Sequence, residues 1–143
     1  MTSTPPAPAE QPTRERSAVR AIVAAMRPRQ WAKNVLVFAA PLAAGELLNA
    51  DVFLPSVGAF VAFCLISSAT YLVNDVRDVE SDRAHPVKCS RPIAAGEVST
   101  TTALIVAAVL AVLALAFAFT ISTGLGGVLV AYAVFTGAYS LFL

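Results

Sequence analysis

Long stretches without charge constrain this chain more than any other feature of its sequence. Residues 52–74 contain no Asp, Glu, Lys or Arg, and none follows Glu97. About 20 consecutive apolar residues are enough for a helix to cross the hydrocarbon core of a bilayer, and both stretches are longer. Charged residues make up 13% of the chain, compared with about 25% in soluble domains, so the sequence predicts an integral membrane protein.

The fold class that follows is all-α, a polytopic bundle of transmembrane helices. We expect four spans, at about residues 31–49, 52–74, 100–120 and 126–143. The last span lacks the polar flank that normally ends such a helix, so we expect the sequence to be cut off in or just after it. Small residues in the second span suit close contact between helices: Gly58, Ser67, Ser68 and Ala69.

The N-terminal residues 1–17 are rich in Pro and poor in aliphatic side chains, which predicts a disordered cytoplasmic tail. Residues 18–143 are expected to form one transmembrane domain. It begins with a short helix on the membrane surface, because apolar residues recur at helical spacing from Ala18 to Met26. A secretory signal peptide is the alternative, but Pro41 and Glu46 interrupt its apolar run.

The basic residues predict how the chain is oriented in the cell membrane. They precede the first span or follow the second, and the turns on the far side have none: Arg14, Arg16, Arg20, Arg27, Arg29, Lys33, Arg77, Arg83, Lys88 and Arg91. Lys and Arg gather on the cytoplasmic side of membrane proteins. The tail and the loop of residues 75–98 are therefore expected in the cytoplasm.

Negative charge is concentrated where the second span ends. If the helix continues to Asp82, then Asp75, Asp78 and Asp82 share one face and extend over about 10 Å. Together with Asn74 they offer the hard oxygen ligands that Mg²⁺ takes when it carries a substrate diphosphate. We expect Asn74, Asp75, Asp78 and Asp82 as metal ligands and the three aspartates as catalytic groups.

Positive charge follows in the next loop. Arg83, Lys88 and Arg91 suit the binding of phosphate oxygens, and Lys33 enters the first span, where a charge is costly and usually functional. The alternative is a solvated loop whose charges pair with each other and with lipid headgroups. The net charge of +1 provides no general attraction for nucleic acid.

The remaining reactive side chains give weaker signals. His85 is either a general base or a structural hydrogen-bonding group, because it is a single histidine in a loop. Tyr71 is more typical of an interfacial aromatic residue than of a catalyst. Cys64 and Cys89 have neither the spacing of a disulfide framework nor that of a metal-thiolate site.

Three blocks of sequence resemble a known family. Asn74-Asp75-x-x-Asp78-x-x-x-Asp82 after a membrane span is similar to the first aspartate-rich motif of the UbiA superfamily of intramembrane prenyltransferases. The segments RPRQWAKN (27–34) and DRAHPVKCSRPIAAG (82–96) resemble its decaprenyl-phosphate phosphoribosyltransferase branch. The resemblance covers about residues 18–143.

The resemblance implies a bundle of about nine helices around a cavity open to the cytoplasm and to lipid. It implies Mg²⁺-dependent transfer of phosphoribosyl from phosphoribosyl pyrophosphate (PRPP) to a polyprenyl (decaprenyl) phosphate, with release of pyrophosphate. The lipid product would serve cell-wall arabinan precursor synthesis. In that reaction Asn74, Asp75, Asp78 and Asp82 would hold Mg²⁺ and diphosphate, and Lys33, Arg83, Lys88 and Arg91 would bind phosphates. The family also has a second acidic motif on a later helix, whereas this sequence has no Asp or Glu after Glu97.

Other functions stay open at this point. An aromatic prenyltransferase of the same superfamily would use the same acidic motif on a prenyl diphosphate. A non-enzymatic membrane carrier or channel would use the aspartate face to line a cation path. A remnant that inserts into the membrane without activity is the third alternative, and the sequence leaves the oligomeric state undetermined.

Overall fold

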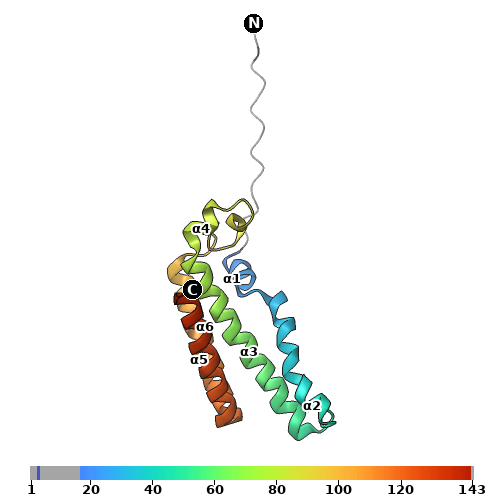
Figure 1. The fold of residues 1–143 in the computed structure, drawn as a ribbon. Coiled ribbons are helices and arrows are strands. Elements are labelled where there is room, and N and C mark those ends of the chain that lie inside the picture. Colours follow the sequence, from blue (N-terminus) through green and yellow to red (C-terminus); the bar gives the residue numbers. More distant parts are fainter. Residues whose placement is uncertain (1–2, 4–16, 143) are drawn as a thin grey trace.

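A computed structural model describes residue 3 and residues 17–142. The elements in this part of the chain are helices, and no strand occurs within it (Figure 1): α1 (Ala18–Met26), η1 (Pro28–Phe38), α2 (Ala39–Ala43), α3 (Ala50–Arg77), α4 (Val79–Ala84), η2 (Lys88–Ser90), α5 (Thr100–Ile121) and α6 (Thr123–Phe142). The predicted all-α class is confirmed. The predicted disordered tail lies outside the described residues except for Ser3 and Ser17, and the Ser17 side chain caps the N-terminus of α1.

Three of the described helices, α3, α5 and α6, are long and apolar enough to cross a membrane. They pack side by side, and α3 contacts both of the others (Figure 1). Each begins or ends a few residues from the expected boundaries: α3 continues to Arg77, and α6 begins at Thr123 rather than near residue 126. Gly124, Gly126 and Gly127 are helical, and a Cβ at Gly126 would overlap the ring of Phe119.

The segment expected as the first span does not form one long α-helix. It forms the 3-10 helix η1, the short helix α2 and a turn. In a 3-10 helix the residues i and i+3 lie on the same side. Trp31 and Asn34 have this spacing, and both donate hydrogen bonds to α3: Trp31 Nε1 to Ser68 Oγ at 2.8 Å and Asn34 Nδ2 to Ser67 Oγ at 3.5 Å. Contact with α3 therefore favours the three-residue period.

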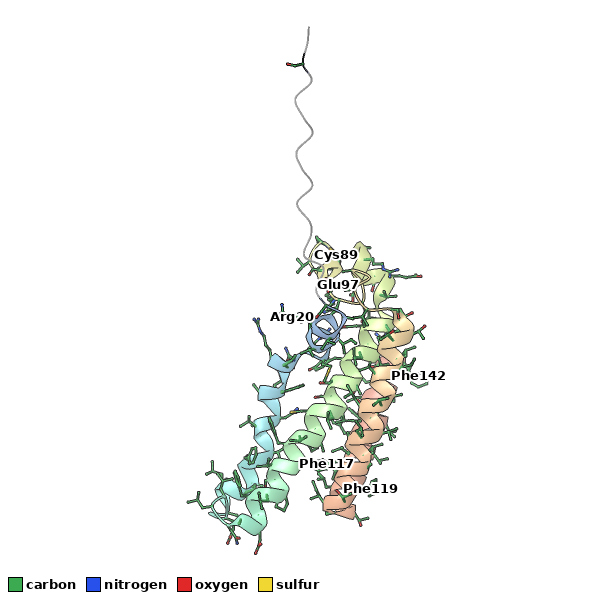
Figure 2. All side chains as sticks on the ribbon, turned by 180° about the vertical axis from the view of Figure 1, so that it is seen from behind. Arg20, Cys89, Glu97, Phe117, Phe119 and Phe142 are labelled. Carbon is green, nitrogen blue, oxygen red and sulfur yellow. The ribbon has the colours of Figure 1, made fainter. Side chains whose placement is uncertain are left out.

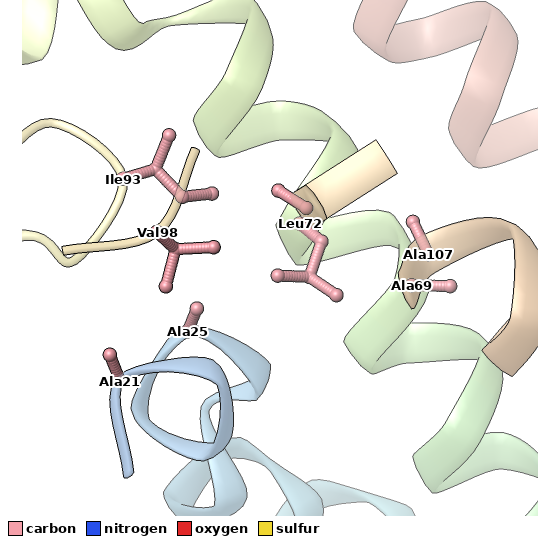
Figure 3. Packing of buried hydrophobic residues seen from close by; sticks show 8 residues of the cluster. Ala21, Ala25, Ala69, Leu72, Ile93, Val98 and Ala107 are labelled. Carbon is pink, nitrogen blue, oxygen red and sulfur yellow. The ribbon is translucent and has the colours of Figure 1, made fainter. Parts of the chain in front are cut away.

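The interior consists of two apolar clusters. The cluster nearer the loop joins α1, α3, α5 and the loop itself, as Figure 3 shows for Ala25, Leu72, Ile93 and Val98. The other joins α3, α5 and α6 through small residues and leucine, among them Ala62, Ala114 and Leu129. Small residues let helix axes approach closely in lipid, which is the role predicted for Gly58, Ser67, Ser68 and Ala69, and all four are buried.

The loop of residues 75–98 is more structured than its polarity suggests. It contains the end of α3, α4, η2 and a turn at Gly96, whose φ of +81° is accessible to glycine. Ile93 and Val98 anchor the loop because both are buried against α1 and α3 (Figure 3). Figure 2 shows Arg20, Cys89 and Glu97 near this end of the molecule and Phe117 and Phe119 near the opposite end.

Candidate functional site

Two aspartates form the centre of the candidate site. Asp75 lies in the last turn of α3 and Asp82 lies in α4, and they are 2% and 3% exposed. Carboxylates are almost never buried without a partner that compensates for the lost hydration. These two therefore require positive charge close by.

Arg91 supplies part of that charge from the loop. Its Nη1 lies 3.1 Å from Asp82 Oδ2 and 3.5 Å from Asp75 Oδ1, so one guanidinium bridges both carboxylates. The neighbouring residues Pro92 and Ile93 are buried, which holds Arg91 in place. The acidic stretch and the basic loop thus meet at Arg91, where the charges pair with each other as in the alternative to phosphate binding.

Arg27 supplies the rest from the junction of α1 and η1. Its Nη2 donates a hydrogen bond of 2.6 Å to Asp75 Oδ1. The guanidinium carbon also lies 4.7 Å from the centroid of the Tyr71 ring, which is a cation–π contact. Sequence reasoning assigned neither residue to the site, although Tyr71 precedes Asp75 by four residues and so lies one helical turn below it.

Asp78 does not join the buried pair, and the expectation that three carboxylates share one helix face is wrong. It assumed one continuous helix, but α3 ends at Arg77 and α4 begins at Val79. Asp78 lies at the break between the two helices, its side chain is 38% exposed, and its Oδ1 accepts a hydrogen bond from Arg77 Nε at 3.2 Å. The break turns Asp82 back toward Asp75 and leaves Asp78 outside.

Asn74 also faces away from the aspartate pair. Its Oδ1 accepts a hydrogen bond from Ser140 Oγ, which joins α3 to α6. Next to this bond is an apolar cavity of about 280 Å³ between α3, α5 and α6, with Ala69, Ala107 and Gly137 in its lining. A second cavity of about 310 Å³ shares Ser140 with the first and includes Asn74. Both cavities lie close to the polar end of α3.

Comparison with known proteins identifies the group to which these features belong. The profile of the UbiA prenyltransferase family matches residues 34–143. The chain belongs to this family. It is 53% identical over 125 residues to the decaprenyl-phosphate phosphoribosyltransferase of Mycobacterium tuberculosis, an alignment that covers 85% of this chain and 41% of the relative.

Two further relatives carry the same name. The protein from Mycolicibacterium smegmatis is 48% identical over 125 residues, covering 85% of this chain and 39% of its own length. The protein from Corynebacterium glutamicum is 49% identical over 105 residues, covering 72% and 32%. This UbiA-family chain therefore spans about two fifths or less of the length of these relatives, and the resemblance predicted from its three sequence blocks is confirmed.

Three other residues were predicted to bind phosphate, namely Arg83, Lys88 and Lys33. Arg83 is exposed, and its Nε donates to the carbonyl oxygen of Ala94 at 3.1 Å. Lys88 is exposed in the same loop. Lys33 is exposed on η1 and falls between Trp31 and Asn34, which both face α3, so the three-residue period directs Lys33 away from that helix.

The His85 side chain forms hydrogen bonds within its own loop. Its Nδ1 accepts hydrogen bonds from the backbone N–H groups of Val87 and Lys88 at 3.1 and 3.0 Å. These bonds cap the turn that leads into η2. Of the two roles left open for His85, the geometry favours the structural one.

Whether this site suits Mg²⁺ depends on the carboxylates of Asp75 and Asp82. Within the described residues no three His, Cys, Asp or Glu side chains are close enough to hold a metal ion. Mg²⁺ needs fewer, since it usually binds one or two carboxylates and completes its shell with water and substrate phosphate. Asp75 and Asp82, which Arg91 links, provide that number of carboxylates.

Proposed function

We propose that this chain takes part in transferring 5-phosphoribosyl from PRPP to a polyprenyl phosphate such as decaprenyl phosphate, with release of pyrophosphate. The relatives are named for phosphoribosyl transfer involving decaprenyl phosphate, and the product of the proposed reaction would feed cell-wall arabinan synthesis. The observation that carries the proposal is the buried pair Asp75 and Asp82, paired with Arg27 and Arg91 at the end of a membrane helix. Acidic and basic groups in contact there suit a metal-complexed diphosphate.

The proposed reaction does not require a strong base from the protein. A phosphate monoester has a second pKa of about 6, so the lipid phosphate is largely dianionic near neutral pH and can itself attack the ribose. Its oxygen forms a bond to C1 as the bond from C1 to the pyrophosphate oxygen breaks, and the electron pair leaves with pyrophosphate. His85, which accepts two backbone hydrogen bonds, need take no part.

The chain's own charges would act on both sides of that bond. The carboxylates of Asp75 and Asp82 would stabilise the positive charge that develops on the ribose. The guanidinium of Arg91 would bind phosphate oxygens, and Arg83 and Lys88 extend the basic surface toward solvent. Lys33 remains a predicted phosphate ligand on the side of η1 that faces away from α3.

Asp75 and Asp82 would hold Mg²⁺, with Asn74 and Asp78 as further predicted ligands whose side chains face Ser140 and Arg77 in this structure. When bound, Mg²⁺ would offset the negative charge that grows on the departing pyrophosphate. The apolar cavity between α3, α5 and α6 suits part of the polyprenyl chain, since its lining is mainly alanine and aliphatic carbon.

We further propose that η1 and α2 form the first of four spans in a bundle of about nine. The 11 residues of η1 and the 5 of α2 extend over about 30 Å at about 2.0 and 1.5 Å per residue, which matches the hydrocarbon core. The positive-inside rule then places α1, α4 and the aspartate pair in the cytoplasm. The exposed basic residues Arg20, Arg83 and Lys88 support this orientation.

The test is transfer by membranes that contain this chain. Membranes supplied with decaprenyl phosphate, Mg²⁺ and ribose-labelled PRPP are expected to form a labelled lipid, and the Asp75→Asn variant is expected to reduce its formation at least a hundredfold. The absence of labelled lipid, combined with consumption of a prenyl diphosphate in the presence of an aromatic acceptor, would contradict the proposal and support an aromatic prenyltransferase. Conductance through these membranes that Asp75→Asn abolishes would support the channel alternative.

A further inference from the structure

The contact between Arg27 and Asp75 has a consequence for how the site is filled. Asp75 Oδ1 accepts a 2.6 Å hydrogen bond from Arg27, and the same oxygen lies 3.5 Å from Arg91. A charge-assisted bond of this length is among the stronger contacts that a carboxylate makes. A metal ion that used this oxygen would have to displace Arg27 first.

The backbone of Arg27 has a conformation that arginine rarely adopts. Its φ of 55° and ψ of 64° lie in the left-handed region, where glycine and asparagine are favoured. Arginine occupies this position although glycine would fit the turn better. Its side chain then reaches across Tyr71 to Asp75, which indicates that the guanidinium compensates for a disfavoured backbone.

Neighbouring contacts hold the turn in place. Ser68 Oγ donates a hydrogen bond of 2.9 Å to the carbonyl oxygen of Met26, and the Arg27 N–H donates to the carbonyl oxygen of Ala24. Pro28 follows and begins η1. The position of Arg27 above Asp75 is therefore built into the junction of α1, η1 and α3.

The charges of the cluster are already balanced. Asp75 and Asp82 carry two negative charges, and Arg27 and Arg91 carry two positive charges. A divalent cation added to this cluster would create an excess of two positive charges at a buried location, which is unfavourable. A diphosphate entering with the cation supplies the missing negative charge and offers the guanidiniums new oxygen partners.

We propose that Arg27 is a diphosphate-binding residue that occupies Asp75 until a metal-complexed diphosphate arrives, so that metal and diphosphate bind together. On their arrival the Arg27 guanidinium exchanges the Asp75 carboxylate for a phosphate oxygen, and the carboxylate becomes available to the metal. This inference rests on the proposed function, because it takes the aspartate pair as the metal site. It adds a residue to that site and an order of binding.

The test measures metal binding and not turnover. The full chain in nanodiscs of neutral lipid is dialysed to equilibrium against radioactive Mn²⁺, with and without inorganic pyrophosphate, and empty nanodiscs serve as the blank. The wild type is expected to bind Mn²⁺ at least tenfold more tightly with pyrophosphate. Inorganic phosphate, which has one phosphate group, is expected to give less than a twofold effect.

Arg27→Gln is expected to reverse this pattern. With Asp75 released, Mn²⁺ without pyrophosphate should bind at least fivefold more tightly than to the wild type, and the enhancement by pyrophosphate should fall below threefold. Arg29→Gln is the matched control, since it removes the same charge two residues away from an exposed position, and it should behave as the wild type. Circular dichroism checks that each variant keeps its helices.

Two results would overturn the inference. One is equal affinity of the wild type for Mn²⁺ with and without pyrophosphate, which requires no variant to fold. The other is an Arg27→Gln protein that matches Arg29→Gln in both conditions. If the inference alone fails, Mn²⁺ still binds and Asp75→Asn abolishes that binding, whereas no Mn²⁺ binding in any condition would remove the proposed function as well.

Two further ligands distinguish whether the site takes a sugar diphosphate or a prenyl diphosphate. PRPP in place of pyrophosphate is expected to give the same enhancement and the same dependence on Arg27. Farnesyl diphosphate should give a smaller enhancement than PRPP if the site accepts a sugar diphosphate. Enhancement by farnesyl diphosphate and not by PRPP would contradict the assignment of Arg27 to phosphoribosyl transfer.

Discussion

The two sides of α3 are joined to their neighbours by different kinds of contact. Toward α5 and α6 the contacts are mainly apolar, as with Ala62, Ala114 and Leu129, and the bond between Ser140 and Asn74 is an exception. Toward α1 and η1, polar contacts join the apolar ones, with Ser68 bonded to Trp31 and Asp75 bonded to Arg27. In lipid, both close packing and hydrogen bonds can hold helices together. The apolar side provides close packing, whereas the polar side places particular atoms and thereby builds the site.

The largest effect is expected from breaking the polar side at Arg91. Arg91→Ala removes the guanidinium that bridges Asp75 and Asp82 and leaves two buried carboxylates with one partner. Removing one member of a buried ion pair costs about 3–5 kcal/mol, so the free energy of unfolding should fall by about that amount. Reversible unfolding in mixed micelles with increasing SDS measures the change.

Lys88→Ala is the matched control for Arg91→Ala. Lys88 lies in the same loop, carries the same charge and is exposed, so its loss should change the free energy of unfolding by less than about 1 kcal/mol. Similar losses for both variants would show that the loop charges act through general attraction and not through the contacts of Arg91.

A smaller effect is expected on the apolar side at Gly126. A Cβ there would overlap several atoms of the Phe119 ring, so the whole ring would have to move. Gly126→Ala should therefore cost about 1–3 kcal/mol of the free energy of unfolding. Gly127→Ala is the control, because a Cβ at Gly127 meets nothing within 4 Å. That variant should stabilise α6 by about 0.5–1 kcal/mol, since alanine favours a helix over glycine.

The same SDS titration compares the two glycine variants. Destabilisation by Gly126→Ala and stabilisation by Gly127→Ala would show that contact with Phe119 decides the sign. A stabilising effect of both would mean that α5 and α6 are packed less closely than this structure shows.

The smallest effect is expected for Ser68→Ala, which tests whether the polar side holds the turn at Arg27. The substitution removes the acceptor of the Trp31 indole N–H and the donor to the Met26 carbonyl, at a cost of about 1–2 kcal/mol. Trp31 is the single tryptophan of the chain, so its emission maximum reports the change directly. Ser56→Ala removes a bond within α3 and should leave the emission unchanged. An unaltered spectrum in Ser68→Ala would contradict the role given to Ser68.

Much of the helical architecture follows from local sequence. The helix Ala18–Met26 was predicted with the bounds that the structure shows, because its apolar residues repeat at helical spacing. The three long helices were predicted to within a few residues, because length and hydropathy determine a membrane span. Family membership was also readable from three short blocks, and the family profile that confirms it matches residues 34–143.

The errors arose where the chain's conformation depends on its neighbours. A continuous helix through Asp78 was the natural extrapolation from Asp75 and Asp82, but the break after Arg77 rotates Asp78 out of the cluster. Likewise, the three-residue period of η1 depends on where Ser67 and Ser68 stand in α3. Neither the break nor that alignment is visible in a window of a few residues.

The sequence by itself determined that the chain is helical, lies in the membrane and gathers most of its charges at one end, because hydropathy and charge act locally and sum along the chain. The tertiary structure decided which charges meet. It brought Arg27 to Asp75 across 48 positions of sequence and let Arg91 join Asp75 to Asp82. Such contacts depend on how separate helices pack, because an ion pair needs its atoms within about 4 Å, a distance that sequence spacing cannot specify.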